Sequence, residues 1–91
     1  MSDVQEVKDY LVEMGCDEAV VFENPSYAEA FVGVSQDGRA VYLFEKMCAH
    51  LMEKEGLSEE DAVDFICYNT IRAIPYMGEQ APIVFYGLTS V

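Results

Sequence analysis

Basic residues are scarce in this 91-residue chain: five lysines and arginines stand against 17 aspartates and glutamates, giving a net charge of −12. A protein that binds nucleic acid directly needs cations to neutralise phosphates, so this shortage argues against direct nucleic-acid binding. It argues equally against binding to anionic membrane surfaces. Three roles remain for the acidic balance: solubility, binding of a basic protein partner, or occupation of a surface that normally holds nucleic acid.

Cysteine and histidine are also scarce. Cys16, Cys48 and Cys67 are odd in number and form no C-x-x-C pair, and His50 is the only histidine. This pattern indicates neither a disulfide framework nor a zinc site, so we expect free thiols, no metal and no cofactor. We expect His50 to lie exposed on a helix, with no nucleophile spaced to work with it, and the chain has no glycine-rich phosphate loop. The sequence therefore predicts a protein that is not an enzyme.

Long apolar runs are absent as well. No segment approaches the ~20 apolar residues of a membrane-spanning helix, and the acidic start lacks the features of a signal peptide. We therefore expect a cytoplasmic protein with no membrane contact. The length predicts one small domain, residues 1–91, whose apolar share of 52% is high for its size.

The periodicity of apolar residues predicts seven elements. A helix over about 3–14 is expected to begin with a capping box formed by Ser2 and Gln5 and to end at Gly15. Strands are expected at 19–22, 28–34 and 40–43, with Gly33 a candidate for a β-bulge and a turn at 35–39. Two helices follow, from 44 to a stop at Gly56 and from a cap at Ser58 to a stop at Pro75, before a last strand at 83–86.

The order α-β-β-β-α-α-β predicts an α+β fold. We expect a three-stranded antiparallel meander, a C-terminal strand and three helices on one face of the sheet. The sequence does not place the fourth strand beside the first or beside the third.

The stretch from 68 to 86 holds the candidate site. We expect Tyr68 and Arg72 to share one stripe of the third helix, where the guanidinium can stack on the ring. Tyr76 and Met77 follow in the next loop, and these four residues have the composition of a protein interface. Polar groups at the border of the apolar helix face predict a second role for this region: Asn69 and Thr70 would hydrogen-bond the backbone of 74–82 and pin the loop.

The same region carries a resemblance to known sequences. The motifs "SQDGRAVYLFEKM", "GLSEEDAVDFICYNTIRAIPY" and "GEQAPIVFY" resemble a family of short, acidic, uncharacterised proteins from gut-associated Firmicutes and their mobile elements. The resemblance covers the chain from about residue 17 onward. It implies a bacterial cytoplasmic setting and carries over no catalytic residue.

Two functions follow from these observations. The first is a small acidic protein-interaction module without chemistry of its own, and the alternative is a charge-based inhibitor or nucleic-acid mimic encoded by a mobile element. We also expect a homodimer, because three helices on one face leave the other face of the sheet to be covered. Phe31, Tyr42 and Tyr86 are the aromatic candidates for that open face.

Overall fold

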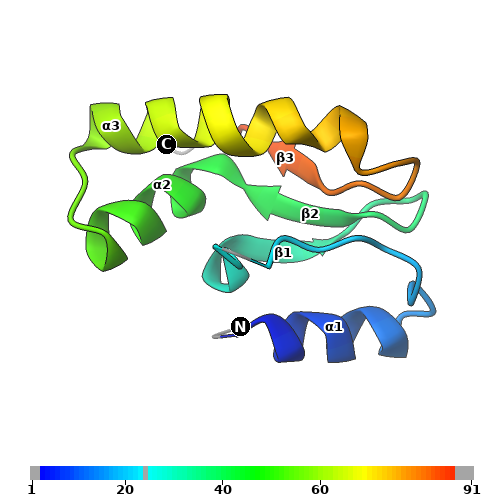
Figure 1. The fold of residues 1–91 in the computed structure, drawn as a ribbon. Coiled ribbons are helices and arrows are strands. Elements are labelled where there is room, and N and C mark those ends of the chain that lie inside the picture. Colours follow the sequence, from blue (N-terminus) through cyan, green and yellow to red (C-terminus); the bar gives the residue numbers. More distant parts are fainter. Residues whose placement is uncertain (1–2, 24, 88–91) are drawn as a thin grey trace.

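The computed structural model describes residues 3–23 and 25–87. Figure 1 shows α1 at the bottom, a small sheet in the middle, α2 to the left of the sheet and α3 along the top. The elements in chain order are α1 (Val4–Glu13), the 3₁₀ turn η1 (Ala28–Ala30), β1 (Phe31–Val34), β2 (Ala40–Leu43), α2 (Phe44–Lys54), α3 (Glu59–Phe65), the π-helical η2 (Ile66–Thr70), the 3₁₀-helical η3 (Ile71–Tyr76) and β3 (Ile83–Phe85).

The sheet confirms the α+β class but corrects the predicted meander. Among the described residues it has three strands in the order β1-β2-β3, with β1 antiparallel and β3 parallel to the central β2. The last strand therefore lies beside the predicted third strand, and the sheet is mixed. A parallel neighbour needs a long crossover, which α2, α3, η2 and η3 supply.

The predicted strand at 19–22 is wrong. Its residues belong to no helix or strand; the Val20 N–H donates to the Gln80 carbonyl at 3.0 Å. Phe22 is buried, and its ring lies 4.7 Å from that of Tyr42 and 5.6 Å from that of Tyr27. The apolar run thus marks a segment that packs into the core, which periodicity alone does not distinguish from a buried strand.

The predicted bulge at Gly33 is confirmed. The pairing of β1 with β2 slips between Phe31 and Gly33, where φ is +149°. A bulge adds one residue to one strand, so side chains on its two sides no longer follow simple alternation. Val32 is therefore exposed, whereas Val34 packs against the core.

The helix ends follow local chemistry, with one correction. Asp3, and not Ser2, caps α1: its carboxylate accepts the Glu6 N–H at 2.9 Å, and Ser2 lies outside the described residues. Ser58 caps α3 as predicted, accepting the Asp61 N–H at 3.1 Å. Positive φ values of +77° and +70° at Gly15 and Gly56 end α1 and α2, as glycine permits.

The third helix is less regular than predicted. It changes from α to π geometry at Ile66 and to 3₁₀ geometry at Ile71, and it ends at Tyr76. Pro75 therefore lies inside its last turn and does not terminate it, contrary to expectation.

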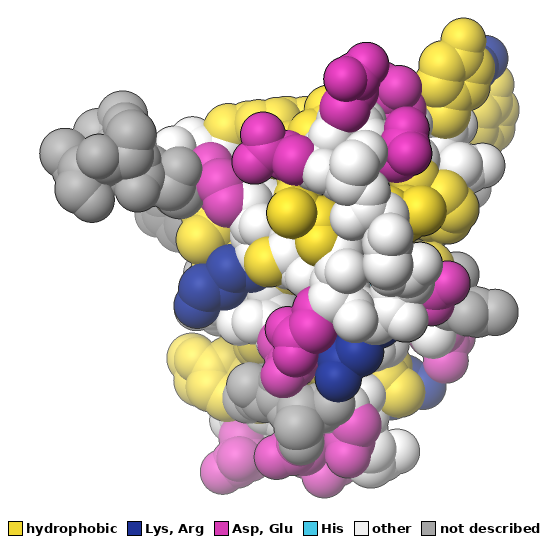
Figure 2. All heavy atoms as spheres, turned by 90° about the vertical axis from the view of Figure 1, so that its left-hand side faces the viewer, with side chains coloured by type: hydrophobic (Ala, Val, Ile, Leu, Met, Phe, Trp, Pro, Cys, Tyr) yellow, Lys and Arg dark blue, Asp and Glu magenta, His cyan; other side chains and the backbone are white. Residues whose placement is uncertain are grey.

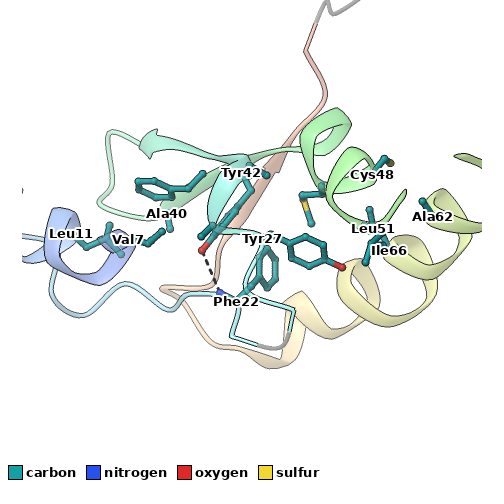
Figure 3. Packing of buried hydrophobic residues seen from close by; sticks show 14 residues of the cluster. Val7, Leu11, Phe22, Tyr27, Ala40, Tyr42, Cys48, Leu51, Ala62 and Ile66 are labelled. Carbon is teal, nitrogen blue, oxygen red and sulfur yellow. Dashed lines mark hydrogen bonds between the residues drawn. The ribbon is translucent and has the colours of Figure 1, made fainter. Parts of the chain in front are cut away.

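One apolar cluster holds these elements together, on one face of the sheet (Figure 3). Ala40 and Tyr42 form its sheet side. The helices contribute Val7 and Leu11 from α1, Met47, Cys48 and Leu51 from α2, and Ala62 and Ile66 from α3 and η2. All three helices thus cover the same face, as predicted.

Candidate functional site

Tyr68 and Arg72 lie at the surface of the third helix, as their spacing predicts, and Tyr76, which was expected in the following loop, lies at the end of the helix. Tyr68 is 71% exposed and Tyr76 is 90% exposed. The Arg72 guanidinium carbon lies 5.4 Å from the centre of the Tyr68 ring, which confirms the predicted stacking. Met77 does not project with them, because its side chain is half-buried and packs against the core.

The prediction that Asn69 and Thr70 hydrogen-bond the backbone of the 74–82 loop is wrong, because both side chains have other partners. Asn69 is exposed, and its side-chain N–H donates to the Phe65 carbonyl at 3.1 Å, one helical turn back. Thr70 is buried, but its hydroxyl shares a hydrogen bond of 3.3 Å with the Tyr27 hydroxyl. Thr70 therefore ties the third helix to residue 27 and leaves the loop to other contacts.

Tyr27 is the most unusual backbone position among the described non-glycine residues. It has φ +50° and ψ +30°, a left-handed conformation that is unfavourable for a bulky side chain, and it is fully buried. The hydrogen bond to Thr70 and the edge-on contact with Phe22 hold it there. Burial raises the pKa of its hydroxyl, whereas the hydrogen bond from Thr70 acts in the opposite direction.

Arg39 holds the loop before β3, a role that the sequence analysis missed. Its Nε donates to the Ala81 carbonyl at 2.7 Å, and its guanidinium lies 3.9 Å from the Asp37 carboxylate. Because Ala81 is buried, this bond satisfies a carbonyl that water reaches poorly. Arg39 sits at the end of a hairpin turn, and no local pattern relates it to a residue 42 positions later.

The face of the sheet opposite the core is apolar, and no helix within the described residues covers it. Residues paired across strands point to the same side, so the ladder assigns this face: Gly33 and Ile83 pair with Val41, and Phe85 pairs with Leu43. We define the outer sheet face as the five side chains Val32, Val41, Leu43, Ile83 and Phe85. None of them belongs to the core cluster or packs against it.

Two of these side chains are largely open to solvent. Val32 is 51% exposed and Phe85 is 54% exposed. A Cβ at position 87 would lie 3.1 Å from Leu43 Cδ1 and 3.3 Å from Phe85 Cε2, so the Leu43 and Phe85 side chains converge on one point. The outer sheet face therefore forms one connected patch at its β3 end.

The aromatic residues expected on this open face need correction. Phe31 and Tyr42 face the core, where their ring centres are 5.6 Å apart. Tyr42 tolerates full burial because its hydroxyl accepts the Phe22 N–H, and burial raises its pKa to about 12. Tyr86 is exposed as expected and stacks on Phe44, with the ring centres 4.6 Å apart.

A groove runs between α2 and α3, next to the Phe44–Tyr86 stack. We call it the α2–α3 groove; its volume is about 400 Å³, and it is lined by Phe44, Glu45, Cys48, Ala49, Met52, Glu59 and Val63. One carboxylate oxygen of Glu45, Oε2, is buried and accepts no hydrogen bond from the described residues. The pKa of the Cys48 thiol is raised, first by burial and then by the charges of Glu59, Cys67 and Glu45.

His50 differs from its predicted environment. Its side chain is only 17% exposed, its Nδ1 lies 3.9 Å from a Glu29 carboxylate oxygen, and its ring packs edge-on against Tyr27. Nδ1 is buried and makes no hydrogen bond within the described part of the chain. His50 thus packs from α2 against Tyr27 and Glu29 and does not lie free on the helix surface.

Within residues 3–23 and 25–87, no group of three or more histidine, cysteine, aspartate or glutamate side chains could hold a metal ion. No helix in this part of the chain has the length and apolarity needed to span a bilayer. Cys16, Cys48 and Cys67 are free thiols.

The outer sheet face and the α2–α3 groove are the two candidate binding surfaces. Comparison with known proteins identifies no ligand for either of them. No family model matches the chain, and no curated protein or solved structure shows significant similarity to it. The resemblance to acidic Firmicutes proteins stays a prediction.

Proposed function

We propose that this protein is a small interaction module that binds another protein through its outer sheet face and carries out no chemistry of its own. One observation carries the proposal. All three helices cover one face of the sheet and leave five apolar side chains on the other face. Connected apolar surface of this kind typically marks a protein contact.

The composition of the outer sheet face supports this role. Its five members are Val, Leu, Ile and Phe, with no charged residue among them, although the chain as a whole carries a net charge of −12. Depletion of charge and enrichment in aromatic groups distinguish the centre of an interface from ordinary surface. Arg39 and Tyr86 flank the patch and supply the polar and aromatic rim.

Tyr68, Arg72 and Tyr76 offer a second exposed region, which the sequence analysis favoured. Its members are spread along the third helix, and Met77, its intended apolar anchor, is turned toward the core. The outer sheet face has the stronger case because its side chains adjoin one another on regular strands. We keep the three third-helix residues as a secondary contact surface.

A second copy of the chain is one candidate partner, so we retain the proposal of a homodimer. Two chains of −12 repel each other, but charges separated by more than ~8 Å are largely screened at physiological salt. Association through an uncharged patch would therefore strengthen as salt is added.

The alternative of a nucleic-acid mimic needs carboxylates in rows across one connected face. Figure 2 shows acidic side chains on the left-hand side of the molecule at the top, in the middle and at the bottom, interrupted by basic side chains and by hydrophobic and neutral surface, so that they form no continuous row on this face. This distribution favours the interaction module over the mimic.

Photo-crosslinking tests the proposal. Benzoylphenylalanine would replace Phe85 on the outer sheet face in one variant and Tyr76 on the third helix in another. We expect the Phe85 variant to form a defined adduct in cells, with a second copy or with another protein, and the Tyr76 variant to form little. Adducts from position 76 alone, or from neither position, would overturn the assignment to the sheet.

A further inference from the structure

The α2–α3 groove begins at the end of the sheet, because Phe44, which lines it, directly follows β2. Phe44 lines the groove and stacks on Tyr86, which directly follows β3. A protein that contacts Tyr86 at the end of β3 would therefore lie next to a residue of the groove.

The apolar part of the groove suits the hydrocarbon portion of a partner's side chain. Phe44, Cys48, Ala49, Met52 and Val63 supply five of its seven lining residues. Met52 is 40% exposed, so part of this apolar lining is open to solvent. Burying a hydrocarbon chain there removes apolar surface from water on both partners.

The polar part of the groove contains a carboxylate oxygen that lacks a hydrogen-bond donor. Glu45 Oε2 is buried without a donor among the described residues, and a buried carboxylate oxygen is unfavourable unless it is paired. Glu45 lies in the first turn of α2, where the helix dipole favours negative charge. Glu59, in the first turn of α3, brings a second carboxylate to the same groove.

The cations of the chain do not fill this need. Lys8 pairs with Glu23, Arg39 contacts Asp37 and the Ala81 carbonyl, and Arg72 lies over Tyr68. The other two cations, Lys46 and Lys54, form no ion pair with any described residue. Within the part of the chain that the structure describes, no ion pair reaches either carboxylate of the groove.

We infer that the α2–α3 groove receives a lysine or arginine side chain from a protein partner, whose cationic group binds Glu45. Such side chains bury their hydrocarbon stems along apolar surface and keep a charged end for pairing. An apolar side chain would leave Glu45 Oε2 unpaired, and a second copy of this chain brings a net charge of −12 toward two carboxylates. The inference rests on the proposed function and specifies the chemistry of the partner.

A charge-matched pair of variants tests the inference. E45Q removes a charge from the groove, whereas E60Q removes the same charge from an exposed residue next to Glu59 that does not line it. The probe is a short acetylated peptide with leucine on each side of a central arginine, and its control carries citrulline, the uncharged analogue of arginine. Binding is followed by NMR through the Met52 methyl group and the Cys48 amide.

We expect the arginine peptide to shift both signals and the citrulline peptide to do so far more weakly. E45Q should weaken binding about fivefold or more, because it removes a charge-assisted hydrogen bond, and E60Q should weaken it less than about twofold. Equal effects of E45Q and E60Q, or equal binding of the two peptides, would overturn the inference. A groove occupied by a second copy would also overturn it, and would appear as Met52 shifts that depend on protein concentration without peptide.

The outcome separates this inference from the proposed function. If crosslinks from position 85 persist while the peptide shows no preference for arginine, only the chemistry of the groove is wrong. If those crosslinks are absent while the peptide binds through Glu45, the groove is a site and the outer sheet face is not. Thermal unfolding of E45Q and E60Q, compared with the parent protein, confirms that both variants are folded.

Discussion

The two faces of the sheet use similar residues in opposite ways. Ala40 and Tyr42 alternate with Val41 and Leu43 along β2, yet the first two are fully buried and the second two belong to no core cluster. Alternate side chains of one strand thus either pack in the core or lie on a surface that no described helix covers. Hydrophobicity alone does not say which face a residue serves, because the difference is set by where the helices pack.

The largest expected effect comes from making the same substitution on the two faces. Leu51→Ala removes a core side chain that is 1% exposed and should lower the free energy of unfolding by about 2–5 kcal/mol. Leu43→Ala, on the outer sheet face, should lower it by about 1 kcal/mol or less. Urea unfolding of both variants measures the difference, and equal losses would mean that the outer face is part of the core.

Alkaline pH should weaken the core face next. The pKa of Tyr42 is about 12 in the folded chain against an ordinary value of 10, because burial disfavours the phenolate. Its contribution is fully present below pH 10 and is lost as the pH rises toward 12, since the unfolded chain releases this proton first. The free energy of unfolding should fall by about 2–3 kcal/mol over that interval.

Tyr42→Phe is the control for this pH effect. It leaves the Phe22 N–H without its acceptor and lowers stability at neutral pH, but it should flatten the dependence on pH above 10. Tyr27 and Cys48, whose pKa values are also raised by burial, contribute a remaining slope of the same sign. An unchanged slope in Tyr42→Phe would show that Tyr42 is not the group responsible.

A smaller effect is expected at the hydrogen bond between Tyr27 and Thr70. Tyr27→Phe and Thr70→Val should each lower the free energy of unfolding by about 1–2 kcal/mol, because each leaves a buried hydroxyl without its partner. The double variant should lose less than the sum of the two. Additive losses in this double-mutant cycle would mean that the hydroxyls are not energetically coupled.

The smallest effect on stability is expected at Phe85. Phe85→Ser on the half-exposed outer face should change the free energy of unfolding by only about 0.5 kcal/mol. The same change should abolish association through this face, measured by sedimentation at low and high salt. A variant that unfolds easily and keeps its partner would reverse the roles assigned to the two faces.

Local features of the fold could be predicted from the sequence. The hairpin at 35–39, the cap at Ser58 and the stops at Gly15 and Gly56 were correct because each depends on neighbouring residues. The bulge at Gly33 was also foreseen, since glycine within a strand marks such sites.

Contacts between distant residues could not be predicted. Periodicity states that 83–85 form a strand but not that the strand runs parallel to β2. It likewise did not relate Arg39 to Ala81, or Thr70 to Tyr27. Asn69 was misplaced because the π-helical turn at Ile66–Thr70 changes the phase of the helix, and a regular wheel assumes that the phase is constant.

The residues of the outer sheet face were also misassigned, because the sequence does not show which side of the sheet each strand residue faces. The prediction that one sheet face stays open followed from the element order, but Phe31 and Tyr42 were assigned to it because they are aromatic. Only the observed register assigns the face to Val32, Val41, Leu43, Ile83 and Phe85.

The bulge in β1 also has a consequence for changes of chain length. Phe31 pairs with Tyr42 and Val34 with Ala40, so β1 spans this interval with one residue more than β2 does. Deleting Gly33 would leave Val32 opposite Val41 and restore an unbroken ladder, with each remaining side chain still on its present face. Most deletions within a strand exchange its two faces, whereas this position can lose a codon and change only the bend of the strand.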